Sequence, residues 1–180
     1  MRKFALSACV SLAGLCGCSS LLSFDVNSSG TATIQGSPTG GLLGNALGGG
    51  FGGFNNFNVS QSQDFRNENT NKDHISECRV TKLTLKVLKP VPPAAGSDLS
   101  FLTQIDFFIT APNLPKVHIA GAKNPPAGQS SVDLTLDNVD IAAYAKSDTF
   151  SITTDAQGHA PASDTNIEAD LTLNIHASLL

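Results

Sequence analysis

The stretch at residues 166–179, NIEADLTLNIHASL, decides the fold class because its side chains alternate strictly between apolar and polar. A period of two is typical of a β-strand with one face in a core and the other in water. The sequence therefore predicts a long, one-sided antiparallel strand here. Its expected buried set is Ile167, Ala169, Leu171, Leu173, Ile175, Ala177 and Leu179.

Shorter segments repeat this alternation along the chain. Strands are expected at 81–89 (TKLTLKVLK), 104–111 (QIDFFITA), 116–120 (KVHIA), 131–137 (SVDLTLD) and 149–154 (TFSITT). A further strand is expected at 57–65 (FNVSQSQDF), and weaker ones at 23–27 and 31–35. Helix signals are confined to 137–147, with Asn138 as the expected cap, and to a single turn at 97–104.

Eight or nine strands, Pro- and Gly-rich turns and little helix predict an all-β fold. We expect one antiparallel β-sandwich domain of immunoglobulin-like architecture at 22–180. A closed β-barrel is the alternative. The unequal strand lengths favour the sandwich.

The N-terminus has the form of a secretion signal. Arg2 and Lys3 precede an uncharged, mostly apolar stretch at 4–15, which is too short to span a bilayer core of about 30 Å as a helix. Small residues follow, as expected near a cleavage site. One interpretation is an ordinary secretory peptide, cut near Gly17 or Ser19.

The four residues LCGC at 15–18 resemble the lipobox of bacterial lipoproteins. Leu15 stands three residues before the cut, Gly17 just before it, and Cys18 is the first mature residue. Cys16 departs from the commonest pattern, which has Ala, Ser or Thr there. The resemblance covers only the first 20 residues.

This resemblance implies a signal peptide at 1–17 and a lipidated tether at 18–21. In the family, the Cys thiol receives a diacylglyceryl group and the new amine is usually acylated, with palmitate as a typical chain. Ser19 at the second mature position implies the outer membrane of a two-membrane bacterium, because the usual retention signal is Asp. Whether the protein faces the periplasm or the outside stays open.

Removal of the signal and lipidation of Cys18 would leave Cys78 as the single free thiol, which we expect to be a small buried hydrophobe. The remaining chain has nine basic and 15 acidic side chains, a formal charge of about −6 with neutral histidines. This scattered acidic surface argues against nucleic acid and against anionic head groups as partners.

One segment, 36–53, departs from the strand pattern, since half of it is glycine. The favoured interpretation is a flexible insertion between two strands. The alternative is an apolar contact loop that touches the bilayer or a partner, because exposed apolar clusters mark contacts. Its candidate contact residues are Leu42, Leu43, Leu47 and Phe51.

No motif for catalysis, cofactor binding or metal binding stands out. His118 and His176 alternate outward on strands among polar neighbours, which favours a surface role over that of a base. The acids Asp133, Asp137 and Asp140 lack the calcium-loop pattern. We therefore predict a non-enzymatic, membrane-anchored binding or structural module without cofactor or metal, which contacts a protein through loops or edge strands. A carrier of a small apolar or lipid ligand between the sheets is the alternative.

Overall fold

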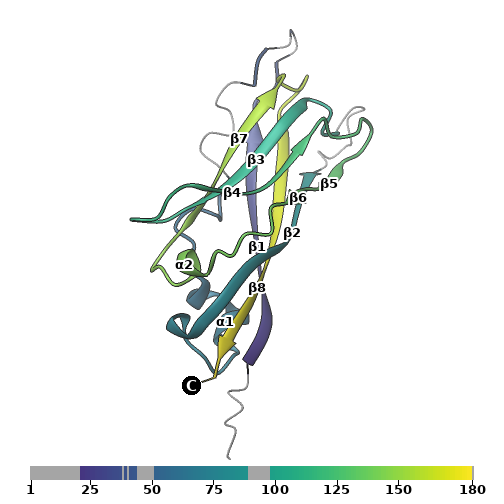
Figure 1. Cartoon of the computed structure of the whole chain (residues 1–180). Coiled ribbons are helices and arrows are strands. Elements are labelled where there is room, and N and C mark those ends of the chain that lie inside the picture. The colour runs from purple at the N-terminus through teal and green to yellow at the C-terminus, as the bar shows by residue number, and fades with distance from the viewer. Residues whose placement is uncertain (1–20, 38, 40, 44–50, 89–97, 180) are drawn as a thin grey trace, which may run out of the picture.

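The computed structural model describes residues 21–37, 39, 41–43, 51–88 and 98–179, and the account below concerns these residues. They form eight strands in two antiparallel sheets that pack face to face, with only short helices (Figure 1). This confirms the predicted all-β sandwich. No helix in the described part of the chain is long and apolar enough to cross a membrane.

The first sheet has the strand order β1-β8-β2-β5, and the second β6-β4-β3-β7. The first comprises β1 (Leu21–Ile34), β8 (Thr165–Ser178), β2 (Ile75–Leu88) and β5 (Ser131–Asp133). The second comprises β6 (Thr135–Leu136), β4 (Val117–Lys123), β3 (Leu102–Thr110) and β7 (Ser151–Gly158). The first and last strands pair with each other, so the likeness to an immunoglobulin sandwich lies in the layers and not in the strand order.

Strand β8 lies in the interior of its sheet, between β1 and β2. It pairs with β1 without interruption from Leu21 opposite Ser178 to Ile34 opposite Thr165. Six of its seven expected core side chains, Ile167 to Ala177, are buried. The seventh, Leu179, lies beyond the strand end and is 42% exposed, which corrects the sequence prediction. The two weak candidates at 23–27 and 31–35 are one continuous strand, β1.

The segment 131–137 is not the single strand that its alternation predicts. Its first half, β5, pairs with β2, and its second half, β6, pairs with β4 in the other sheet. Leu134 lies between the two halves, is buried, and donates its N–H to the Leu83 carbonyl. The chain thus changes sheets at Leu134, where one apolar side chain serves both layers.

The segment 57–65 is helical, so the predicted strand there is wrong. It forms the 3-10 helix η1 (Val59–Gln61) and the helix α1 (Gln63–Arg66). The side chains of Asn58 and Ser62 accept hydrogen bonds from the first free N–H groups of these turns. Such caps satisfy the donors that a helix start leaves open. Val59 and Phe65 are nevertheless buried.

The expected helix at 137–147 is the single turn α2 (Ala142–Ala145), but its cap is not Asn138. Asn138 has a φ of 54° and lies before the helix. The Asp140 carboxylate instead accepts the N–H of Ala142, and also that of Cys78 on β2. It therefore fixes α2 against the first sheet. The single helical turn expected at 97–104 is wrong in the part that the structure describes, because residues 98–101 form bends and turns and β3 begins at Leu102.

The segment 51–57 crosses one side of the sandwich and joins its two sheets. Gly52 bridges to Thr31 on β1, and Phe57 bridges to Phe150 at the start of β7. Gly30 permits this approach, because a Cβ added there would lie 2.6 Å from the Gly52 oxygen. The crossing buries Phe51, whose ring stacks on Phe107 at 5.6 Å between centroids.

The strands run lengthwise, so the domain has two ends. We call the end that holds Leu21 and Ser178 the proximal end, and the end that holds Ile34 and Thr165 the distal end (Figure 1). The 14 residues of β1, at about 3.3 Å each, separate the two ends by roughly 43 Å. The connections that follow β1, β2, β4 and β7 all leave from the distal end.

Candidate functional site

The four candidate contact residues of the glycine-rich segment do not share one environment. Leu42 is 84% exposed, whereas Leu43 and Phe51 are buried in the core. Leu43 is held there because its N–H donates to the Gly158 carbonyl at the end of β7. Leu47 lies outside the described residues. Leu43 and Phe51 are therefore corrected to core residues, and Leu42 is the exposed member of the set.

Leu42 lies at the distal end, where it bridges to His159 just beyond β7. The glycine-rich segment is close to Cys18 in sequence, but the whole length of β1 intervenes. Leu21, which follows the tether, and the distal end are thus roughly 43 Å apart. Contact between this loop and the bilayer that holds the lipid would require the domain to lie along the membrane.

Leu42 stands at the rim of a distal depression of about 420 Å³. Three segments line it, with Leu42, Leu43, Thr103, Ala156, Gln157, Gly158 and His159. Gly158 is required at its base, because an added Cβ would lie 2.1 Å from the Phe101 oxygen. The depression is mainly apolar, and His159 is the single titratable residue in its lining. This composition suits contact with a partner's side chain and offers no acid–base pair for catalysis.

Hydrogen bonds fix the neighbouring distal loops to each other. The Asp98 carboxylate accepts from the Ser100 hydroxyl and N–H and from the Gly128 N–H. These bonds, led by the one from the Ser100 hydroxyl, lower the pKa of Asp98. The connection before β3 and the Pro-rich connection after β4 are thereby joined, so part of the distal end is ordered before any partner binds.

A second polar site lies on the outer face of the second sheet. His118 Nδ1 is 2.6 Å from Asp137 Oδ2, and its Nε2 is 3.2 Å from Asp106 Oδ1. A bulge in β4 buries both Ile119 and Ala120, so that His118 and Gly121 share the outer face. Gly121 leaves room for the contact, since an added Cβ would lie 2.6 Å from Asp106 Oδ1. A depression of about 450 Å³ lies here.

The two carboxylates favour a charged imidazolium at His118. Partial burial disfavours the charge, but the hydrogen bonds to Asp137 and Asp106 outweigh burial and raise the pKa of His118. Both ring nitrogens are engaged, so neither carries a free lone pair for a substrate proton or a metal. His118 thus bridges β3 to the end of β6, and sequence reasoning missed this because the bulge and the sheet change are non-local.

The three acids considered for calcium each contact a different protein group. Asp133 accepts from the Thr84 hydroxyl, and Asp140 from two backbone N–H groups. Asp137 faces His118. The three carboxylates therefore do not converge. The described ranges hold no group of three or more His, Cys, Asp or Glu side chains that could bind a metal ion.

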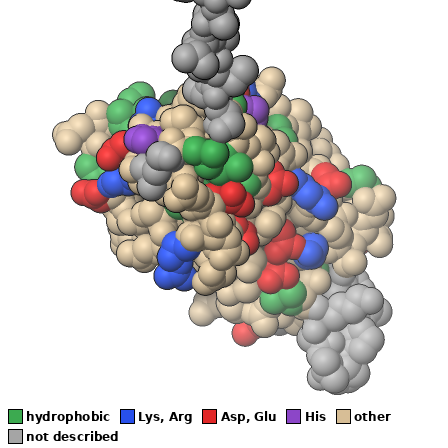
Figure 2. Space-filling model, turned by 90° about the horizontal axis from the view of Figure 1, so that it is seen from below, with side chains coloured by type: hydrophobic (Ala, Val, Ile, Leu, Met, Phe, Trp, Pro, Cys, Tyr) green, Lys and Arg blue, Asp and Glu red, His purple; other side chains and the backbone are tan. Residues whose placement is uncertain are grey.

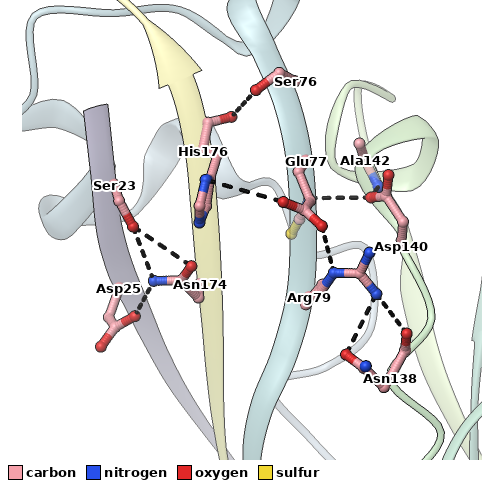
Figure 3. A network of polar contacts seen from close by, with 11 residues as sticks. Ser23, Asp25, Ser76, Glu77, Arg79, Asn138, Asp140, Ala142, Asn174 and His176 are labelled. Atoms are coloured by element: carbon pink, nitrogen blue, oxygen red, sulfur yellow. Dashed lines mark hydrogen bonds and ion pairs between the residues drawn. The ribbon is translucent and has the colours of Figure 1, made fainter. Parts of the chain in front are cut away.

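The outer face of the first sheet carries a network of polar contacts (Figure 3). Arg79 donates to Glu77 and to the Asn138 carbonyl, and His176 lies 3.9 Å from Glu77. On the neighbouring strands, Asn174 donates to Asp25. These partners cross β1, β8 and β2, so the polar face that the alternation predicts is a set of cross-strand pairs.

Cys78 is buried beneath this network with no exposed surface. Burial, and secondarily the charge of Asp140, raises the pKa of its thiol to about 12. A thiol that stays protonated is a poor nucleophile and a poor metal ligand. The prediction of a small buried hydrophobe is confirmed.

No protein-family model matches the sequence, and no curated protein matches it at a significant level.

The contrast between the buried Phe51 and the exposed Leu42 yields a first prediction, made with the matched variants Phe51→Ala and Leu42→Ala. Removal of the buried Phe51 ring should lower the free energy of unfolding by about 3–5 kcal/mol, because it leaves a cavity beside Phe107. Removal of the exposed Leu42 side chain should change it by no more than about 0.5 kcal/mol. Urea unfolding measures both. Equal losses would contradict the assignment of Phe51 to the core and Leu42 to the surface.

The His118 bridge yields a prediction of pH dependence. Because folding raises the pKa of His118 above 6.5, its stabilisation is complete below the unfolded pKa and disappears as pH rises through the folded pKa. His118→Gln should therefore lower stability at about pH 5.5 by up to about 1 kcal/mol, and less at about pH 9. Unfolding curves at both pH values measure this. In an Asp106→Asn/Asp137→Asn background the difference between the two pH values should vanish.

Proposed function

We propose that this protein is a lipoprotein of the outer membrane, anchored through Cys18, which acts as a non-catalytic binding module. The observation that carries the proposal is the lipobox-like LCGC at 15–18 followed so closely by the folded domain. Strand β1 begins at Leu21, three residues after Cys18. The expected cleavage thus falls just outside the sandwich and leaves its core complete.

The lipid alone suffices for anchoring in this proposal. Each buried methylene contributes about 0.8 kcal/mol, so one chain holds a protein marginally, while two or more hold it stably. A diacylglyceryl group with an amide-linked chain exceeds that threshold. The formal charge of about −6 after cleavage gives no attraction to anionic lipid, so the chains carry the attachment.

The distal loops are better placed for a partner than the sheet edges. On β1, the Asn27 N–H donates to Asp64, and Thr31 exchanges hydrogen bonds with Gly52. The outer edge of β7 is likewise bonded to 51–57 at one end and to Leu43 at the other. The edge strands β5 and β6 have three and two residues. The bonded stretches of β1 and β7 and the short strands β5 and β6 are poor sites for strand addition, which favours binding at the distal loops.

The alternative function, carriage of a small apolar or lipid ligand between the sheets, requires unfilled interior space. The described interior is instead filled by large side chains with almost no exposure. They include Phe51, Phe54, Phe107, Phe150, Ile105, Leu99 and Leu102. No observation here favours the carrier, so the binding module is the better supported proposal.

The anchor is tested on protein from native membranes. Mass spectrometry of the N-terminal peptide should show a chain that begins at Cys18 with added acyl mass. The wild type should partition into detergent, whereas Cys18→Ser should partition into water, because it cannot receive the diacylglyceryl group. An unmodified N-terminus and a water-soluble wild type would overturn the anchor.

Binding at the distal end is tested with a photo-crosslinking residue in intact cells. Placed at Leu42, it should form a covalent adduct with a partner. Placed at the exposed Lys82, on the outer face of the first sheet, it should form none. Leu42→Asp should weaken the complex without lowering thermal stability. Deletion of the whole loop is unsuitable, because it removes the core residues Leu43 and Phe51. Adducts at Lys82 alone would move the binding surface to the sheet.

A further inference from the structure

The proximal end carries two exposed leucines, one at the end of β1 and one just beyond the end of β8. Four large hydrophobic side chains are exposed in the described part of the chain, and Leu21 and Leu179 are two of them, at 69% and 42%. Leu21 pairs with Ser178 across β1 and β8, and Leu179 follows Ser178 directly. The two leucines therefore lie at the same tip of the first sheet, with Leu21 on its outer face and Leu179 continuing the core-facing positions of β8. We call them the proximal leucines.

These leucines lie within a short reach of the proposed lipid. Consecutive Cα atoms are 3.8 Å apart, so the Cα atoms of Cys18 and Leu21 are separated by at most about 11 Å. A tether of this length keeps the sheet tip near the head groups to which the acyl chains hold Cys18. Leu88 and Leu42, the other exposed large hydrophobics, lie at the distal end, beyond this reach.

We propose that the proximal leucines insert into the interfacial zone of the bilayer and hold the domain upright on the membrane. This inference rests on the proposed lipid anchor at Cys18, and adds a second contact between the protein and the membrane. The lipid restricts the distance between the domain and the surface, while the two leucines fix its direction. Since β1 runs away from this tip, the distal loops are carried roughly 43 Å from it.

The charges at the proximal end favour an uncharged interfacial contact over binding to anionic head groups. Figure 2 views the molecule from below, and acidic and basic side chains are interspersed on that face. Lys72 near this end is already paired with Asp148, and Arg66 follows Asp64 in the same turn. No surplus of positive charge attracts anionic lipid. The feature that favours contact with the membrane is therefore the exposed apolar surface of the two leucines.

Because the chain contains no tryptophan, the fluorescence of an introduced tryptophan reports on its own position alone. Single tryptophans are introduced as Leu21→Trp, Leu179→Trp and, as the matched control at the distal end, Leu88→Trp. Each lipidated mature protein, which begins at Cys18, is reconstituted into phosphatidylethanolamine/phosphatidylglycerol vesicles that contain acyl-brominated lipid, which quenches tryptophan at short range. Flotation of the vesicles reports in parallel whether the protein is bound.

Both proximal tryptophans should be quenched and blue-shifted, and the Leu88→Trp fluorescence should be unchanged. A twelve-residue Gly-Ser insertion between Ser20 and Leu21 should reduce the quenching while the protein still floats. Bound protein with no quenching at the proximal positions, or with equal quenching at Leu88→Trp, would overturn the inference and leave the anchor intact. Protein that fails to float and carries no acyl mass would instead overturn the anchor and this inference with it.

Discussion

The sandwich depends on β8, whose apolar side chains all face the core while its backbone is paired on both edges. Its 14 residues contact β1 along its full length and β2 along nearly all of it. A shift of one residue would move every one of these apolar side chains to the solvent face, so the register is strongly determined. The lengths and directions of β1 and β2 follow, and with them the positions of the two ends.

Because β8 lies in the interior of its sheet, the free edges of the sandwich are contacted by other segments. The crossing at 51–57 bonds to β1 at Thr31 and to β7 at Phe150 and Ile152. Close approach of the backbones requires Gly30, and the buried Phe51 ring holds the crossing against β3. The same residues that complete the core therefore also occupy part of the free edges of β1 and β7.

Features encoded by long alternation were predictable from sequence, and features set by tertiary context were not. The seven-position pattern gave β8 correctly except for Leu179, because a single buried face dominates its energetics. The alternation at 131–137 is equally regular, yet the chain changes sheets at Leu134, since the same pattern suits either layer. At 57–65, the caps Asn58 and Ser62 outweighed the apolar spacing. The His118 bridge needed a bulge and a glycine, Gly121, whose pairing no local pattern shows.

The glycine-rich segment illustrates how distance along the chain differs from distance in space. Composition correctly marked an apolar, glycine-rich stretch, but could not divide it into the buried Leu43 and Phe51 and the exposed Leu42, because burial depends on Gly158 and Phe107 far away in sequence. The extended strand β1 lies between the tether and the glycine-rich segment, so the segments that precede and follow it start from opposite ends of the domain. If Cys18 bears the lipid, β1 then acts as a spacer, and exposed apolar side chains at its two ends meet different surroundings. In that arrangement, a leucine at the near end would face lipid, and one at the far end would face the aqueous side.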